Sequence, residues 1–348
     1  ESRVYGTYLL QTVLWETCSK IDYTQVAESF VPILIQVLKK VFLVDQDIWE
    51  ANSLVKNISE ILSVPEVFEA FVIKFAQLGI EIMSQEDLPL ELRVKAYGLI
   101  ENDNSSGFAK LLDQDFKIVQ NNLILFINMM VQFLQVQRIE STFDFAGKFF
   151  QNAGASIEGN GIFIFMYKSA CQLAVNLGPI GIQVGLFLLY SIVESQQEYF
   201  SEYIDFIIKY ILTYADCDDD YILHYSFCLL SELSDYATAA ITSKINSIVA
   251  YLTKNIAHPE APNTLDYVLD RSLHPPDNLP EFLQNLINIC QQANSEQIVI
   301  TSISCIASSI SSSFHPCEEI YGMICPILNQ ALQVNNNEMQ KVAIRCFG

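Results

Sequence analysis

Charged residues are scarce in this sequence, and basic ones are the scarcest. Only 17% of the 348 residues are charged, against 51% hydrophobic, and 19 Lys and Arg face 40 Asp and Glu. The resulting net charge of −21 repels nucleic acid and anionic membranes and favours basic partners. The alternative, that the acidic excess only keeps an apolar protein in solution, stays open. We therefore expect protein partners with basic segments and no direct nucleic-acid binding.

Uninterrupted apolar runs of membrane-spanning length are also missing. Residues 169–193 carry no charge, but the segment NLGPIG at 176–181 interrupts them. In a membrane span this segment would place a turn at the centre of the bilayer. The stretch therefore predicts a buried helix–turn–helix and no membrane span.

Motifs for catalysis, metal binding and phosphate binding are lacking as well. There is no CxxC pair, and the histidines appear without ligand spacing and far apart, which disfavours a catalytic pair. Residues 154–159 and 178–181 contain glycines but lack the lysine and the preceding strand of a phosphate loop. Residues 216–220 (DCDDD) lack the spaced ligands of a calcium loop and indicate a solvated turn. The sequence predicts no enzyme, no metal site and no cofactor.

Nine cysteines are present, an odd number, and most stand among apolar residues of expected helices. This pattern is typical of reduced core thiols in an intracellular protein. The chain begins with Glu1, and we interpret it as a segment of a longer protein.

The sequence does contain a recurring pattern of apolar helix, short polar turn, second apolar helix and longer turn. First helices placed near residues 24, 64, 114, 160, 197, 241, 278 and 316 give a mean step of about 42 residues, as in HEAT and armadillo units. The run 298–310 is too long and too rich in small residues for a strand. We predict an all-α HEAT-repeat solenoid, a right-handed superhelical stack of antiparallel helix pairs. Roughly eight pairs would form one continuous array over residues 1–348.

Three helix starts carry capping-box patterns, in which a polar side chain accepts a bond from a free backbone N–H. They begin at Ser63, Ser195 and Asn278, each followed by a glutamate three residues later. Second helices of such pairs usually line the concave side of a solenoid, where partners bind.

The order of several segments resembles the middle repeats of the importin-β (karyopherin-β) superfamily, in particular its karyopherin β-3 branch. Residues 297–332 resemble a repeat with a "VVTSIASVAD" helix followed by an "M-P-x-L" helix, and residues 185–195 (GLFLLYSIVES) resemble "GLMALSAIGEG". Further matches in the same order lie at residues 8–16, 140–150 and 233–237. The resemblance covers essentially the whole chain.

The resemblance implies a nuclear transport receptor that shuttles between cytoplasm and nucleus and binds the lysines of nuclear-localisation signals with concave carboxylates. Matched motif by motif, the carboxylates are Asp144, Glu194 and Asp235. Their spacing of about one repeat would suit an extended basic peptide. The alternative is that they are solvated acids at helix ends. Ran GTPase and nucleoporins are the further partners implied, through the full-length protein.

The sequence departs from the family pattern at three positions. Phe227 and Leu269 stand where the family has asparagines that hold the peptide backbone, and Ser308 stands where the family has an aspartate. This leaves open a different cargo, a spacer role within a receptor, or a HEAT scaffold of a multiprotein complex. Secondary surface candidates are Trp49, Tyr225 and Asp270, although a buried stacking role between repeats is favoured for the two aromatic residues.

Overall fold

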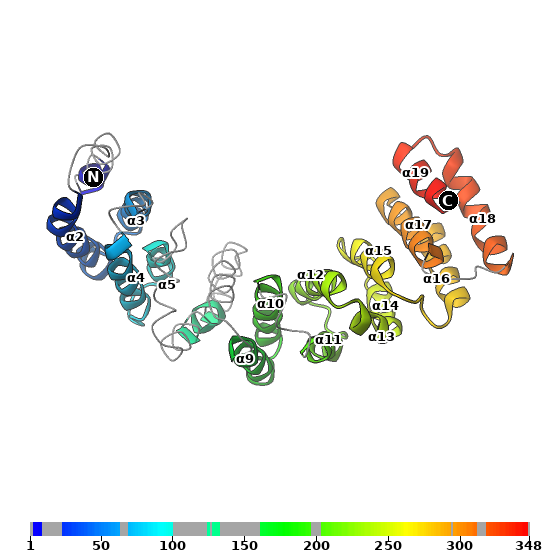
Figure 1. The fold of residues 1–348 in the computed structure, drawn as a ribbon, viewed down its shortest axis with the longest axis horizontal. Coiled ribbons are helices and arrows are strands. Elements are labelled where there is room, and N and C mark those ends of the chain that lie inside the picture. Colours follow the sequence, from blue (N-terminus) through cyan, green and yellow to red (C-terminus); the bar gives the residue numbers. More distant parts are fainter. Residues whose placement is uncertain are drawn as a thin grey trace. The chain divides into compact units, whose positions relative to one another are not determined.

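A computed structural model describes residues 3–8, 23–62, 69–99, 124–125, 127–132, 161–195, 203–293, 295–311 and 318–346. Regular secondary structure in these ranges is helical (Figure 1), which confirms the all-α prediction. The chain divides into two compact units, Glu1–Gly159 and Asn160–Gly348. Each is described by itself, and the single continuous array stays a prediction.

The first unit contains helix pairs of the expected kind. Helix α2 contacts α4 and α3 contacts α5, so that first helices pack on first helices and second on second. Side chains such as Leu38, Phe42 and Leu54 are fully buried between them. The elements are α2 (Tyr23–Lys39), the π-helix η1 (Lys40–Asp45), α3 (Ile48–Leu62), α4 (Glu69–Met83), α5 (Leu90–Ala96) and the 3-10 helix η2 (Tyr97–Leu99).

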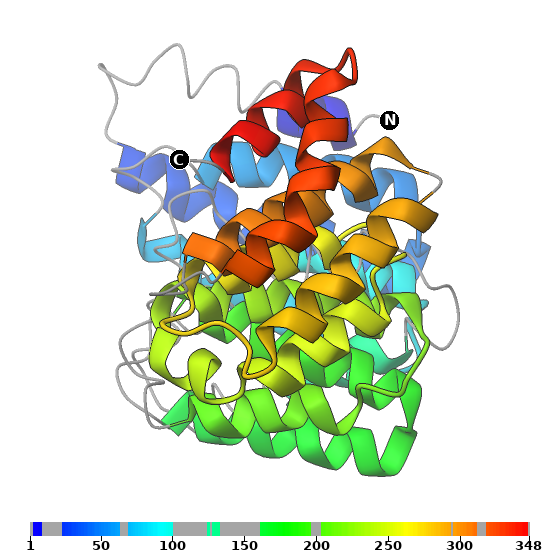
Figure 2. The same cartoon turned by 90° about the vertical axis from the view of Figure 1, so that its right-hand side faces the viewer.

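The second unit contains the candidate site and forms two rows of helices. One row is α10, α12, α15, α17 and α19, in which each helix contacts the next (Figure 1). The green-to-red progression in Figure 2 shows that successive repeats stack in chain order. The first helices are α9 (Gly161–Leu177), α11 (Ile204–Thr213), α13 (Thr238–Ser243), α14 (Ile245–Lys254), α16 (Leu279–Gln292) and α18 (Glu318–Gln333), and the second helices are α10 (Pro179–Ser195), α12 (Asp220–Tyr236), α15 (Ala261–Arg271), α17 (Glu296–Ser311) and α19 (Asn337–Arg345).

The uncharged stretch 169–193 forms the antiparallel pair α9 and α10, as expected. The chain reverses at Gly178, whose φ of 58° lies in the left-handed region that glycine adopts without strain. The close approach of neighbouring repeats depends on Gly185, because an added Cβ there would overlap the Tyr210 hydroxyl and press on Ala170. Among the described helices, none combines the length and hydropathy that a membrane span requires.

Helix starts agree with the sequence at three of the four positions that can be compared. Those expected near 24, 160 and 278 are found at Tyr23, Gly161 and Leu279, whereas the start expected near 241 falls inside α13. Those near 64, 114, 197 and 316 lie outside the described residues. The capping pattern at Asn278 does not act as predicted. Its amide donates to the Glu281 carboxylate instead of its oxygen accepting a backbone N–H, since a bond to a charged acceptor is the stronger one. The other two capping patterns extend into residues that are not described.

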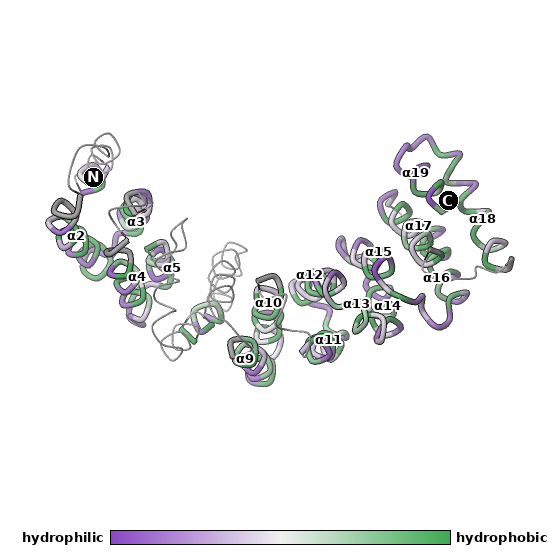
Figure 3. Tube along the Cα trace, viewed as in Figure 1, coloured by the Kyte–Doolittle hydropathy of each residue, from purple (hydrophilic) through white to green (hydrophobic). Residues whose placement is uncertain are grey.

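Hydrophobic residues recur along the described helices and alternate with hydrophilic ones (Figure 3). Helix α10 lies between α9 and α12, and its residues Leu186, Leu188 and Leu189 are fully buried. Cysteines follow this pattern only in part. Cys305 and Cys346 are buried, but five other described thiols are half-buried, so the core-thiol interpretation was too broad.

Candidate functional site

An acidic pocket lies in the second unit, between α12 and α15, with one wall from α10. Its volume is about 360 Å³. Three carboxylates line it, those of Glu232, Asp235 and Glu260. The remaining lining residues are Tyr190, Cys228, Ser231, Asn263, Thr264 and Tyr267.

Helical geometry explains which side chains α12 presents. Positions 228, 231, 232 and 235 recur every three or four residues and therefore share one face of the helix. The helix starts at an N-cap, Asp219, whose Oδ1 accepts from the backbone N–H groups of Tyr221 at 3.1 Å and Ile222 at 3.3 Å. The buried Gln183 side chain of α10 donates to the same oxygen at 2.6 Å. This start fixes the rotation of α12 relative to α10.

Asp235 is held by two partners from α15, Tyr267 and Arg271. Its Oδ2 accepts from the Tyr267 hydroxyl at 2.6 Å, and its Oδ1 lies 3.3 Å from Nε of Arg271. The hydrogen bond to Asp235 raises the pKa of Tyr267, because ionisation of the phenol would remove the donor. The Arg271 guanidinium also lies over the Tyr267 ring, 5.3 Å from its centroid. A basic ligand must therefore share Asp235 with Arg271 or displace it.

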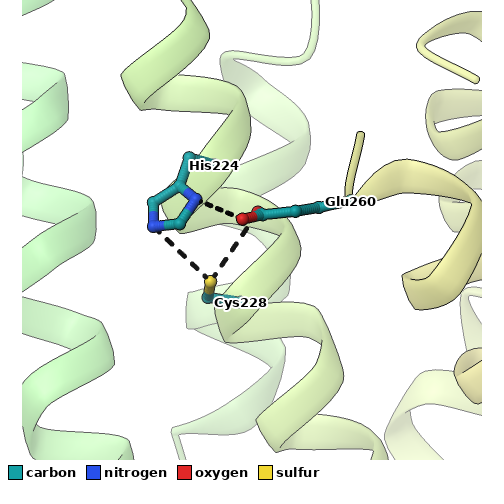
Figure 4. Close-up of side chains that lie close together, drawn as sticks. All are labelled: His224, Cys228 and Glu260. Atoms are coloured by element: carbon teal, nitrogen blue, oxygen red, sulfur yellow. Dashed lines mark hydrogen bonds and ion pairs between the residues drawn. The ribbon is translucent and has the colours of Figure 1, made fainter. Parts of the chain in front are cut away.

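A second cluster, of His224, Cys228 and Glu260, adjoins the pocket (Figure 4). The two ring nitrogens of His224 face different partners: Nδ1 lies 2.6 Å from Glu260 Oε1, and Nε2 lies 3.9 Å from Cys228 Sγ. The thiol also lies 3.9 Å from Glu260 Oε2.

This cluster contains the partners of a Cys–His–carboxylate triad, but its electrostatics oppose nucleophilic catalysis. Burial, followed by the negative charges of Glu260 and Glu232, raises the pKa of the Cys228 thiol to about 12. An activated cysteine needs the opposite, a lowered pKa that populates the thiolate. The protonated thiol is therefore a poor nucleophile at neutral pH.

The sequence predicts a ladder of cargo-binding carboxylates, about one per repeat, formed by Asp144, Glu194 and Asp235. The structure describes the side chain of one of them. Asp235 lies in the acidic pocket. Asp144 is outside the described residues, and Glu194 is in α10 but its side chain is not described. The ladder stays a prediction.

The three secondary surface candidates, Trp49, Tyr225 and Asp270, differ in their exposure to solvent. The favoured buried role is wrong for Trp49, which is 61% exposed near the start of α3 because it shares the exposed face of this helix with Asn52 and Lys56. It is confirmed for Tyr225, which is 9% exposed and packs edge-on against Phe187 and His224. Asp270 is at the surface and forms an ion pair with Arg345 of α19, at 3.1 Å.

The three positions at which the sequence departs from the resemblance do not line the pocket. Phe227 is fully buried against Tyr251 and His258, with ring centroids 5.5 Å and 5.1 Å away. Leu269 is also fully buried. The Ser308 hydroxyl donates to Asp266 Oδ1 at 2.8 Å, which joins α17 to α15. These residues hold repeats together.

Several pocket residues were missed by sequence reasoning. Tyr267 and Glu260 come from the next repeat, and no local pattern connects them to α12. His224 and Cys228 did carry a signal, because a spacing of four residues places two ligands on one face of a helix. The prediction that no histidine has ligand spacing was wrong at this pair.

No protein-family model matches the sequence, and no curated protein matches it. Solved structures do. Kap121p bound to Nup53p is 15% identical with a TM-score of 0.70 over 94% of this chain, and Kap121p bound to RanGTP is 14% identical with the same TM-score and coverage. The chain spans 34% and 35% of those two proteins. The chain therefore has the HEAT-repeat solenoid fold of the karyopherin Kap121p.

Proposed function

We propose that this chain is a section of a nuclear transport receptor and that the acidic pocket binds basic segments of protein cargo. The observation that carries the proposal is the convergence of Glu232, Asp235 and Glu260 on one hollow of a karyopherin fold. A lysine ammonium offers three donors to such carboxylates. The tyrosines Tyr190 and Tyr267 border the same hollow and offer apolar faces for the lysine stem.

Solved relatives of the fold support this reading. Kap121p has been solved with Nup53p, with RanGTP and with Pho4p. One further Kap121p structure carries lysine in place of two aspartates and one glutamate, in the order Asp, Glu, Asp. The proposed ladder of Asp144, Glu194 and Asp235 has the same order. Binding of Ran GTPase and nucleoporins, and shuttling between cytoplasm and nucleus, are proposed for the longer protein.

The proposal is tested by titrating the chain with a lysine-rich signal peptide in a calorimeter, at low and at moderate salt. Asp235→Asn removes the charge but keeps an acceptor for Tyr267, and we expect it to weaken binding several-fold. Arg271→Gln removes the internal competitor of the peptide, and we expect it to strengthen binding. These opposite effects separate a pocket contact from a general loss of folding.

The matched control is Asp205→Asn, which removes one exposed carboxylate from α11 in the other row of helices. It changes the net charge as Asp235→Asn does, so equal weakening by both variants would reduce the effect to long-range attraction. Absence of binding even at low salt would contradict the proposal.

A scaffold in a multiprotein complex is the second candidate. It is favoured by the burial of Phe227 and Leu269, since the side chains at these positions leave nothing to hold a peptide backbone. A scaffold would keep a folded partner bound at moderate salt while ignoring short basic peptides.

A further inference from the structure

The cluster beside the acidic pocket brings one nitrogen, one sulfur and one oxygen ligand together from two neighbouring repeats. His224 and Cys228 lie one turn apart on α12, and Glu260 is the N-cap residue of α15. One potential ligand atom from each lies within 4.8 Å of the other two. Among the residues that the structure describes, this is the one group of its kind.

We propose that His224, Cys228 and Glu260 bind a zinc ion that joins α12 to α15. Zinc takes imidazole nitrogen, thiolate sulfur and carboxylate oxygen together in tetrahedral sites, whereas calcium and magnesium require oxygen ligands alone. Thiolate and imidazole both suit zinc, whereas carboxylate, carbonyl and water ligands suit magnesium, calcium and manganese. The site goes beyond the proposed transport function and does not depend on it.

Two of the three distances between the ligand atoms are close to those of a zinc site. With bonds of about 2.3 Å to sulfur and about 2.0 Å to nitrogen and oxygen, tetrahedral ligands lie roughly 3.5 Å apart. The thiol sulfur now lies 3.9 Å from His224 Nε2 and 3.9 Å from Glu260 Oε2 (Figure 4). His224 and Glu260 now contact each other through Nδ1 and Oε1 at 2.6 Å, and one candidate ligand atom from each of the three residues lies within 4.8 Å of the other two. Closing the site therefore also requires a side-chain rotation that replaces this contact and brings His224 Nε2 and the Glu260 carboxylate to the same ion.

The surrounding structure orients two of the ligands. The Glu260 backbone is held at the start of α15, where its N–H donates to His258 Nδ1 at 3.3 Å and its carbonyl accepts from the Thr264 N–H at 3.0 Å. The His224 ring packs edge-on against the buried Tyr225, with centroids 4.8 Å apart. Such outer contacts hold metal ligands in position.

An ion can reach the site from solvent. The His224 side chain is 40% exposed and that of Glu260 38% exposed. Cys228 and Glu260 also line the acidic pocket, so the fourth ligand position is accessible to water from that side.

Proton balance follows from the ligands. The ion binds the thiolate, so the Cys228 proton is released to solvent, and neutral His224 donates a nitrogen lone pair. The positive charge of the ion offsets the carboxylates of Glu260 and Glu232 that otherwise keep the thiol protonated. Zinc would thereby join α12 to the start of α15, where the contact between His224 and Glu260 joins them in its absence.

The test is titration of the reduced, metal-free chain with Zn²⁺, with binding measured against a colorimetric chelator, and in parallel with Co²⁺. We expect one tight equivalent of Zn²⁺ and an ultraviolet thiolate-to-cobalt charge-transfer band. Cys228→Ser should abolish the band, and it should weaken Zn²⁺ binding at least tenfold. His224→Gln should weaken Zn²⁺ binding similarly, and because its side chain is partly exposed it serves if Cys228→Ser fails to fold.

Cys290→Ser is the matched control, because Cys290 is another half-buried helical thiol and lies on α16, outside the cluster. It should leave both signals unchanged. Absence of saturable Zn²⁺ binding by the unaltered chain, or an unchanged tight equivalent in Cys228→Ser and in His224→Gln, would overturn the proposal.

Discussion

Asp219 joins two consecutive repeats through a single oxygen atom, and its removal gives a defined loss of stability. In Asp219→Ala, α12 loses the side chain that caps its first N–H groups, which costs about 1 kcal/mol. The buried amide of Gln183, which donates to the same oxygen at 2.6 Å, is left without this acceptor, at a cost of about 1–3 kcal/mol. We therefore expect the free energy of unfolding to fall by about 2–4 kcal/mol.

The assay is urea denaturation followed by far-ultraviolet circular dichroism, with the midpoint and slope compared between variants. Asp219→Asn keeps an acceptor oxygen and should retain most of the stability. Asp216→Ala is the matched control, because Asp216 lies in the same acidic turn and is fully exposed, and its ion pair with Lys254 is of the solvent-exposed kind that contributes little to stability. It should leave the midpoint unchanged. Equal effects of Asp219→Ala and Asp216→Ala would refute the reasoning.

Two further predictions concern packing and pH. Gly185→Ala places a methyl group against Tyr210 and Ala170 and should lower the unfolding free energy by about 1–3 kcal/mol. Gly322→Ala adds a methyl group in open space on α18 and should raise the unfolding free energy by about 0.5–1 kcal/mol. Thermal denaturation of both variants checks this, and an undiminished stability of Gly185→Ala would contradict the close approach of the helices at Gly185. Burial raises the pKa of the Cys290 thiol to about 11, so the unfolded state loses this proton near pH 9 while the folded state keeps it. The unfolding free energy should therefore fall between pH 9 and 11, and Cys290→Ala should reduce that fall; an unchanged pH profile would argue against the shift.

The helical pairs could be predicted because their causes are local. Apolar periodicity, the uncharged 169–193 stretch and the turn at Gly178 are written in consecutive residues, and the structure confirms each. The resemblance of segment order predicted the fold class and the position of Asp235 on a second helix.

The acidic pocket could not be derived in this way, because its walls come from three repeats. Tyr267 follows Asp235 by 32 residues and Glu260 follows Cys228 by the same number, so their meeting depends on how α15 is rotated against α12. Leu230 of α12 and Leu265 of α15 are fully buried, and the way in which such side chains pack against each other cannot be read from a linear pattern. Trp49 illustrates the same limit, because a large apolar side chain favours burial while the position of this residue on α3 exposes it.

The central claim is that Asp235 contacts a basic side chain of cargo, and a double-mutant cycle measures that contact directly. Each lysine of the signal peptide is replaced in turn by the uncharged norleucine, and every peptide is titrated against the unaltered chain, Asp235→Asn and Asp205→Asn. We expect one lysine to couple with Asp235 by about 0.5 kcal/mol or more and none to couple with Asp205. Additive effects at every lysine, in a peptide that binds the unaltered chain, would contradict the account.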